Sequence, residues 1–133
     1  MSIKYLDHVN IRTTDLTSLQ SFYEDVLGFQ VGPRPDFPFP GAWLYCGERP
    51  VVHLVGVADP PSPPNALSLE HFAFAAEGLA EFLGHLRQHR VAYRVVIVPT
   101  FNTRQVNFHD SMGNHLHVDF GPEEQADLAP FDP

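Results

Sequence analysis

The chain repeats a short histidine pattern at nearly constant spacing. Leu6–Val9 (LDHV) returns as Leu69–Phe72 (LEHF), so that its histidine recurs after 71 − 8 = 63 positions. Val51–Val55 (VVHLV) returns as His115–Asp119 (HLHVD), with the central histidine recurring after 117 − 53 = 64 positions. Because self-similarity at a fixed offset indicates repeated structural units, the sequence predicts two related modules, each opening and closing on a strand that carries a histidine.

The periodicity of apolar residues gives both modules the same order of elements, strand–helix–strand–strand–strand. Strands are expected at 5–13, 29–32, 43–46, 51–57, 67–75, 92–98, 104–108 and 115–120, with helices from about 16 to 27 and from 79 to 90. Thr14 or Asp15 suits a helix N-cap, and Gly28 suits a helix C-terminus. The expected fold class is α+β, a curled mixed sheet with the helices on its convex side and the histidines on the opposite face.

A chain of 133 residues is long enough for one compact domain with its own core. We expect one domain over 1–133, with module one at about 4–58, a proline-rich linker at 59–66, and module two at about 67–121. The acidic, proline-containing tail at 122–133 is expected to be loosely held.

Composition excludes several classes of function. The formal net charge is −8 and the eight basic residues are scattered, which disfavours nucleic acid as a partner. No apolar run approaches the roughly 20 residues of a membrane span, and the N-terminus does not resemble a signal peptide. Cys46 is the only cysteine and cannot form an internal disulfide, so a cytoplasmic location is expected.

Four histidines are the candidate metal ligands: His8, His53, His71 and His117. Successive side chains of a strand point to opposite faces, so these imidazoles leave the apolar layer on the other side of the sheet. Zinc, nickel, copper and iron(II) all accept imidazole nitrogen. The alternative is that each histidine is an isolated, hydrogen-bonded strand residue, which describes one histidine well but four at matched positions poorly.

The other histidines are weaker candidates. His85 and His89 form an i, i+4 pair on the second helix, but a solvated helix face explains them, and they lack the glutamate of a zinc-protease motif. His109 and His115 flank the last turn and are interpreted as surface turn residues. Asp119 shares the face of His117, and we expect it to act as a hydrogen-bond partner behind that ligand.

Aromatic residues near the middle of module one are the candidate substrate-binding residues. The segment 33–41 carries four prolines together with Phe37 and Phe39, so it predicts a rigid loop that either packs its own rings or forms the lip of a pocket. Trp43 and Tyr45 follow on a strand and could supply an apolar wall for a small-molecule substrate. Plain packing is an equally good interpretation of all four.

The sequence resembles the vicinal oxygen chelate superfamily, which includes glyoxalase I, bleomycin- and fosfomycin-resistance proteins and extradiol dioxygenases. The resemblance covers about residues 4–120. It is carried by Leu6–Val9 with Phe22–Phe29 (FYEDVLGF), by Leu69–His71, and by Phe108–Val118 (FHDSMGNHLHV), which is similar to the family's closing F-x-D-P-x-G-N-x-I-E-L.

This resemblance implies paired βαβββ modules that form a cup around a divalent metal ion (Zn, Ni, Fe or Mn), usually in a homodimer. It places the metal ligands at His8, His53, His71 and His117. The last position is normally glutamate, which can act as the catalytic base, so His117 is the predicted catalytic residue here. Ser111 also departs from the pattern, standing where proline is usual.

Three functions follow as expectations. The leading one is a metal-dependent lyase or isomerase of the glyoxalase kind, acting on a small oxygenated molecule that binds the metal. The first alternative is a ring-cleaving dioxygenase of the extradiol type, although its 2-His-1-carboxylate triad is broken here. The second is a metal-free protein that sequesters a small molecule or antibiotic. A degenerate site without activity is a further reading of the missing glutamate.

Overall fold

The computed structural model of the 133-residue chain describes residues 1, 5–60, 69 and 71–133. It divides into two compact units, Met1–Ser62 and Pro63–Pro133. Most of the predicted linker, 59–66, lies outside the described residues, as does Glu70 of the repeated histidine pattern. No helix in the described part of the chain is long and apolar enough to span a bilayer.

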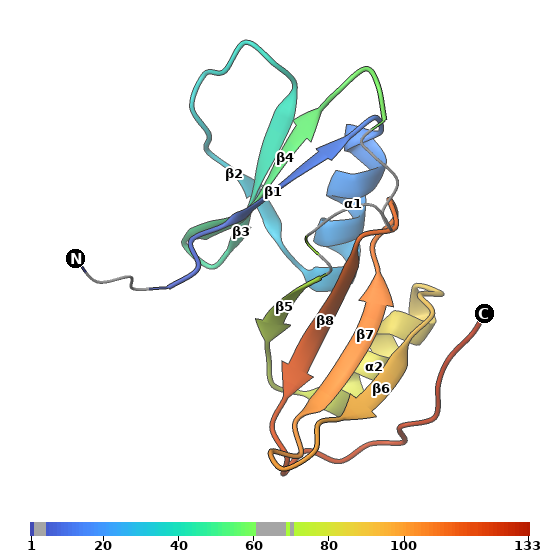
Figure 1. Ribbon diagram of the computed structural model, residues 1–133. Coiled ribbons are helices and arrows are strands. Elements are labelled where there is room, and N and C mark those ends of the chain that lie inside the picture. The colour runs from blue at the N-terminus through green and yellow to red at the C-terminus, as the bar shows by residue number, and fades with distance from the viewer. Residues whose placement is uncertain (2–4, 61–68, 70) are drawn as a thin grey trace. The chain divides into compact units, whose positions relative to one another are not determined.

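The first unit is one helix on a four-stranded sheet. Its elements are β1 (Val9–Thr13), α1 (Leu16–Leu27), β2 (Gln30–Gly32), β3 (Gly41–Cys46) and β4 (Arg49–Gly56). The strand order is β1-β4-β3-β2, with β1 parallel to β4 and the other neighbours antiparallel. Figure 1 shows α1 beside the β1–β4 part of this sheet.

The second unit repeats this topology. Its elements are β5 (Phe72–Ala75), α2 (Leu79–Gln88), β6 (Arg94–Ile97), β7 (Arg104–His109) and β8 (His115–Phe120). The strand order is β5-β8-β7-β6, and β5 is again parallel to β8 while the remaining pairs are antiparallel (Figure 1). The predicted α+β fold of two βαβββ modules is therefore confirmed.

Local sequence explains why α1 begins and ends where it does. The Asp15 side chain accepts a hydrogen bond from the Ser18 amide at 3.0 Å, which makes Asp15 the N-cap. Gly28 adopts a left-handed conformation (φ 72°) after the last helical residue, and its amide bonds back to the Glu24 carbonyl. Between these ends the helix buries Leu19, Tyr23 and Val26.

Each module keeps its core between the helix and one face of the sheet. In module one, β3 and β4 direct Leu44, Val52 and Leu54 to this face, and all three are fully buried. In module two, Phe82 of α2 lies with its ring centroid 5.9 Å from that of Phe108 and 5.6 Å from that of Phe120. Because side chains alternate across a strand, the residues between these core positions face away from the helices.

The C-terminal tail is held against module two, so the expectation of a loose tail was wrong. Tyr93 and Phe131 form an antiparallel bridge with amide–carbonyl distances of 3.0 and 3.1 Å. Arg94 pairs with Asp132 at 3.0 Å. The Glu124 carboxylate accepts hydrogen bonds from the amides of Gly78 at 3.0 Å and Leu79 at 2.6 Å.

The physical reason for this attachment lies at the start of α2. Its N-cap residue is Gly78, which has no side chain to bind the first amides of the helix. Glu124 supplies that missing acceptor from a position 46 residues later. Its negative charge also suits the positive end of the helix dipole.

Replacing Glu124 with alanine is expected to lower the free energy of unfolding by about 1 kcal/mol, the usual cost of losing a helix N-cap. Urea unfolding followed by circular dichroism measures the change. Glu123→Ala is the matched control, because Glu123 is an exposed neighbour and its replacement removes the same charge. Equal effects of the two substitutions would show that the tail does not cap α2.

Candidate functional site

The face of each sheet turned away from its helix carries the histidines that the sequence singles out. In module one, His53 lies on β4 between the buried Val52 and Leu54, so its side chain points away from α1. Its backbone neighbours across the sheet are Asn10 on β1 and Trp43 on β3. His53 is nevertheless 93% buried, since its exposed fraction is 7%.

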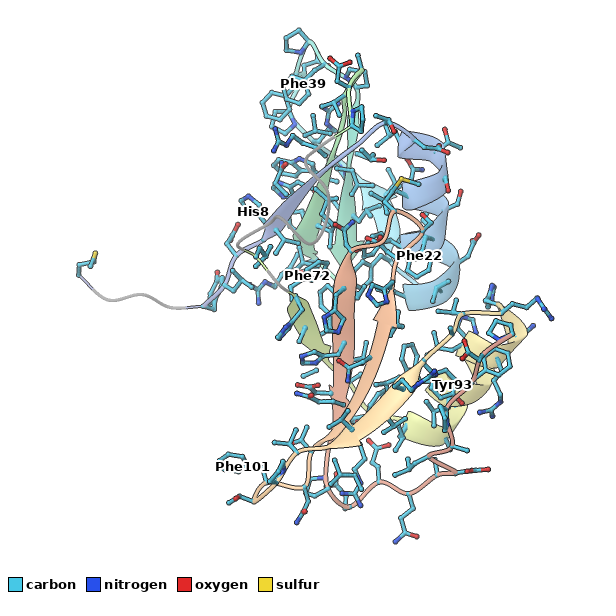
Figure 2. The ribbon with its side chains drawn as sticks, turned by 45° about the vertical axis from the view of Figure 1, so that its right-hand side comes forward. His8, Phe22, Phe39, Phe72, Tyr93 and Phe101 are labelled. Atoms are coloured by element: carbon cyan, nitrogen blue, oxygen red, sulfur yellow. The ribbon has the colours of Figure 1, made fainter. Side chains whose placement is uncertain are left out.

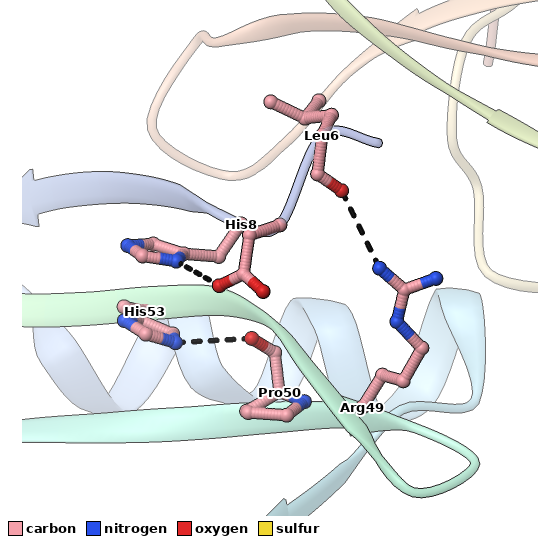
Figure 3. A network of polar contacts seen from close by, with 6 residues as sticks. Leu6, His8, Arg49, Pro50 and His53 are labelled. Atoms are coloured by element: carbon pink, nitrogen blue, oxygen red, sulfur yellow. Dashed lines mark hydrogen bonds and ion pairs between the residues drawn. The ribbon is translucent and has the colours of Figure 1, made fainter. Parts of the chain in front are cut away.

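Two flanking rings produce that burial. The centroid of the His53 ring lies 3.8 Å from that of His8 and 3.9 Å from that of Trp43, with an interplanar angle of 11° in both cases. His8, just before β1, therefore forms a continuous stack of three parallel rings with His53 on β4 and Trp43 on β3. Figure 3 shows the imidazoles of His8 and His53 lying one above the other.

One nitrogen of each stacked imidazole is already hydrogen-bonded within module one. Nδ1 of His8 is 2.7 Å from the Asp7 carboxylate, and Nε2 of His53 is 3.0 Å from the Pro50 carbonyl oxygen (Figure 3). Since both partners are acceptors, these two nitrogens carry the protons, and the other nitrogen of each neutral ring retains its lone pair. The hydrogen bond from His8 also lowers the pKa of the Asp7 carboxyl.

Module two places a second histidine pair on the equivalent face. His117 lies on β8 with an exposed fraction of 5%, and its backbone neighbours are Ala73 on β5 and Asn107 on β7. Its ring centroid is 4.7 Å from that of His71. Asn107 thus stands where Trp43 stands in module one, so module two carries a polar amide in place of the stacking indole.

Asp119 is the hydrogen-bond partner of His117, as the shared face predicts. Its Oδ1 accepts from Nδ1 of His117 at 2.6 Å. The contact fixes the tautomer of His117, with the proton on Nδ1 and a lone pair on Nε2. The predicted contact is confirmed, and its role toward a metal stays a prediction.

His115 belongs to the same polar face, contrary to the interpretation as a surface turn residue. It is the first residue of β8, is half-buried, and its Nε2 lies 3.0 Å from Oδ1 of Asn107. Its ring centroid is 5.3 Å from those of both His71 and His109. Strand alternation predicts this placement, because His115 and His117 are two positions apart on one strand and so share a face.

The donor chemistry of the two pairs suits a divalent transition metal. Histidines that bind metals commonly donate their second ring N–H to a carboxylate or a carbonyl, and His8, His53 and His117 each do so. The arrangement of His8 and His53 suits a shared ion less well, because a metal lies close to the plane of the imidazole that binds it. Two parallel rings 3.8 Å apart must rotate before both can reach one ion.

Consistent with that geometry, no group of three or more His, Cys, Asp or Glu side chains within the described ranges is placed to hold a metal ion. The four candidate ligands instead come as one pair in each module, with His115 beside the pair of module two. The structure therefore brings His8 to His53 and His71 to His117, as the parallel pairing of the first and last strands requires.

The four candidate substrate-binding aromatics fall into three environments. Trp43 stacks on His53, as described above. Tyr45 packs its ring over Gly32, where an added Cβ would lie 2.6 Å from the ring, and its hydroxyl donates to the Pro33 carbonyl. Phe37 and Phe39 stack on each other with centroids 4.9 Å apart, and each is 41% exposed.

Two residues near the site were missed by sequence reasoning. Asp7 is not among the site residues expected from the sequence, yet it binds the His8 ring. Its position next to a histidine was the available signal. Arg34 lies in the predicted proline-rich loop but is not among the expected site residues, yet its guanidinium contacts both Phe37 and Phe39. An arginine beside two aromatics in a stiff loop was the signal there.

Comparison with known proteins identifies the same family of folds. The family model described as "Glyoxalase/Bleomycin resistance protein/Dioxygenase superfamily" matches residues 5–118. The uncharacterized protein YaeR of Escherichia coli (strain K12) is 26% identical over 114 residues, which are 81% of this chain and 88% of YaeR. Glyoxylase I 4 of Arabidopsis thaliana is 28% identical over 120 residues, which are 85% of this chain and 68% of that protein.

A third relative is the manganese-dependent 2,3-dihydroxybiphenyl 1,2-dioxygenase of Geobacillus genomosp. 3. It is 32% identical over 93 residues, covering 65% of this chain but only 28% of the dioxygenase. Among solved structures, lactoylglutathione lyase from Agrobacterium tumefaciens has a TM-score of 0.70 at 21% identity, covering 92% of this chain and 97% of the lyase. A glyoxylase/bleomycin resistance protein/dioxygenase domain from Frankia sp. EAN1pec has a TM-score of 0.75 at 18% identity, covering 93% and 96%. These two likenesses concern the fold.

Stability of the metal-free protein is expected to fall as the pH drops below about 6.5. Burial, followed by the nearby charge of His8, lowers the pKa of His53 from its ordinary value of 6.5. The unfolded chain then binds a proton at a pH where folded His53 does not, so protonation favours unfolding. The contribution of His53 to the free energy of unfolding is therefore complete above its pKa in the unfolded chain. It is lost as the pH falls toward its lower pKa in the folded protein.

Urea unfolding at pH 7.5, 6.5, 5.5 and 5.0 in the presence of a chelator tests this expectation. His53→Gln should lose less stability over this range than the wild type, because glutamine does not titrate but can still donate to Pro50. His89→Gln is the control, since His89 is exposed on module two. A pH dependence unchanged by His53→Gln would contradict the expectation.

Proposed function

Because the chain belongs to the glyoxalase/bleomycin resistance protein/dioxygenase superfamily, we propose that it is a divalent-metal-dependent enzyme of the glyoxalase type. Its reaction would be a lyase or isomerase step on a small oxygenated molecule. One observation carries the proposal: both modules present a histidine pair on the face opposite the helix, and His8, His53 and His117 each have one ring nitrogen anchored by an acceptor.

The proposed ligands are His8 and His53 from module one and His71 and His117 from module two. Nε2 of His8, Nδ1 of His53 and Nε2 of His117 are the nitrogens left with lone pairs by the anchoring hydrogen bonds. Zinc, nickel, iron(II) and manganese are the candidate ions, with imidazole favouring the first three. When bound, the ion supplies Lewis-acid stabilisation of negative charge on a substrate oxygen.

An all-imidazole ligand set leaves the charge of a dication uncompensated. Such a site favours an anionic oxygen of the substrate as the additional ligand. Asp7 and Asp119 lie behind His8 and His117, respectively, and offset part of that charge through the rings that they bind. We expect a small-molecule substrate with adjacent oxygens, bound by a homodimer.

His117 is the residue that we propose for proton transfer. A neutral imidazole accepts a proton near pH 7, and the Asp119 carboxylate on Nδ1 would stabilise the resulting cation, as a carboxylate does behind a general-base histidine. Nε2 is also the proposed metal donor, and its one lone pair cannot bind a metal ion and a proton at once, so the base role is an alternative to the ligand role. A His117→Ala protein that keeps its metal but loses activity would assign His117 to the base role alone.

Ring-cleaving dioxygenase activity is the second candidate. The similarity to a manganese-dependent dioxygenase favours it. The ligand set disfavours it, because four histidines replace the two histidines and one carboxylate of extradiol iron sites. Metal identity separates the two, with iron or manganese pointing to the dioxygenase and zinc or nickel to the lyase or isomerase.

Metal-free ligand binding is the third candidate. The parallel stack of His8, His53 and Trp43 favours it, since stacked rings do not converge on one ion without rotation. Such a protein would sequester a small molecule and would take up no metal under any loading condition.

Metal content decides between these functions. Elemental analysis of protein purified without a histidine tag is expected to give close to one transition-metal ion per chain. His53→Ala and His117→Ala should each lose most of it, because each removes one donor. His89→Ala is the matched control, because His89 is an exposed histidine just after the end of α2 and its loss leaves both pairs intact. Absence of metal both as purified and after reconstitution would overturn the enzyme proposal.

The Asp119 contact gives a separate expectation. Asp119→Asn should weaken metal binding about 10- to 100-fold, as loss of a carboxylate behind a ligating histidine usually does. Competition with a metal-sensitive dye measures the dissociation constant. Asp127→Asn is the control, because Asp127 is an exposed carboxylate of the tail that accepts a hydrogen bond from the Ala129 amide. An unchanged dissociation constant in Asp119→Asn would exclude this role.

A further inference from the structure

Arg34 lies on the sheet of module one although it belongs to the loop at residues 33–40. Its Nη2 donates to the Phe39 carbonyl at 3.1 Å. A Cβ added to Gly41, at the start of β3, would lie 3.1 Å from Nη2 and 3.4 Å from Cζ of Arg34. The atom nearest to that Cβ would be the Leu54 carbonyl oxygen at 2.5 Å, so Gly41 lies close both to the backbone of β4 and to the guanidinium.

The position of Gly41 tells which face of the sheet the guanidinium covers. Ala42 is 4% exposed and faces the core under α1, so Gly41 and Trp43 face the other way. Trp43 stacks on His53. Arg34 thus shares the face of the candidate metal-binding pair, displaced along β3 by two residues, or roughly 7 Å.

Two aromatic rings stand beside this cation. Cζ of Arg34 is 5.3 Å from the ring centroid of Phe37 and 5.5 Å from that of Phe39, distances typical of cation–π contacts. Each ring is still 41% exposed, so both retain surface for another planar group. Figure 2 shows Phe39 in the loop at one end of this module.

The Arg34 charge has no carboxylate partner among the described residues. The described ion pairs involve His8, Arg94 and His117 instead. The Nε of Arg34 is buried and makes no hydrogen bond to any residue that the structure describes. A buried donor without an acceptor is costly, and arginine stays charged at any physiological pH. If Arg34 served only to hold the loop through the Phe39 carbonyl, the buried Nε–H would have no explanation.

We propose that Arg34, Phe37 and Phe39 form a subsite for an anionic oxygen group carried on an aromatic or other planar substrate. The guanidinium would bind the carboxylate or phosphate as a charged hydrogen-bond donor, while the rings pack against its planar part. The inference rests on the proposed function in one respect: the other end of the substrate would carry the oxygens that reach the metal site at His53. It narrows the substrate class to planar anions.

Trp43 is the only tryptophan and lies next to the subsite, so its fluorescence reports binding. Benzoate, phenyl phosphate and benzamide are the probes, the last being a neutral analogue of the first. We expect saturable binding of one or both anions and at least tenfold weaker binding of benzamide, since a hydrogen bond to a charged group contributes about 1.5–3 kcal/mol. Preference between benzoate and phenyl phosphate identifies the anion.

Arg34→Met should weaken binding of the preferred anion about tenfold or more and leave benzamide unchanged. Arg34→Lys should fall between the wild type and Arg34→Met. Arg94→Met is the control, because it removes the same charge from module two. Equal affinity for the preferred anion and for benzamide, or full affinity in Arg34→Met, would overturn the proposal.

A measurement on the wild type guards against a variant that does not fold. The Nε–H signal of Arg34 in a nitrogen–proton correlation spectrum should shift as the preferred anion is added and stay in place with benzamide. A signal unmoved at saturating anion would overturn the proposal whatever the variants do.

Repeating the titration on chelator-treated and metal-loaded protein separates this proposal from the enzyme proposal. Arg34-dependent anion binding by a chain that takes up no metal would support the subsite and reject the enzyme. Metal binding together with anion binding that does not depend on Arg34 would reject the subsite and leave the enzyme proposal standing.

Discussion

Parallel pairing between the first and last strand of each module is the constraint on which the rest of the structure depends. It places Asn10 beside His53 and Ala73 beside His117. His8 and His71, each one position before the start of a strand, are then carried to within ring contact of those partners. A parallel pair needs a crossover connection, and the helix with the two intervening strands provides it. The same connection that closes the sheet therefore creates the histidine pair.

The helix of each module decides which face of the sheet remains available for chemistry. Leucines, valines and phenylalanines from alternate strand positions are buried against α1 or α2, and burying each such side chain contributes roughly 1.5–3 kcal/mol. A shift in register by one residue would turn every histidine into the core and every core residue outward. The hydrophobic core thus fixes the orientation of the imidazoles indirectly, since neither helix needs to contact them.

Hydrogen bonds then set the chemical state of the histidines. Asp7, Pro50 and Asp119 each accept from one ring nitrogen, which leaves the opposite nitrogen of a neutral ring with its lone pair. The two modules differ in what surrounds these rings. Module one flanks His53 with His8 and Trp43 in an apolar stack, whereas module two surrounds His117 with His71, Asn107 and His115. The two modules share the positions of the paired histidines but differ in the residues around them, so the two pairs are not chemically equivalent.

The sequence by itself determined the order of elements, the paired modules and the face on which the histidines lie, because strand alternation and helix periodicity are local patterns. It also contained the contact between Asp119 and His117, which are two positions apart on one strand. The ring stack on Trp43, the Glu124 cap on α2 and the seating of Arg34 over Gly41 were decided only by tertiary structure. Each joins residues from different elements. Glu124 caps α2 because Gly78 has no side-chain acceptor, and Arg34 lies close to β3 where Gly41 has no side chain. Such contacts follow from how segments pack, which no periodicity records.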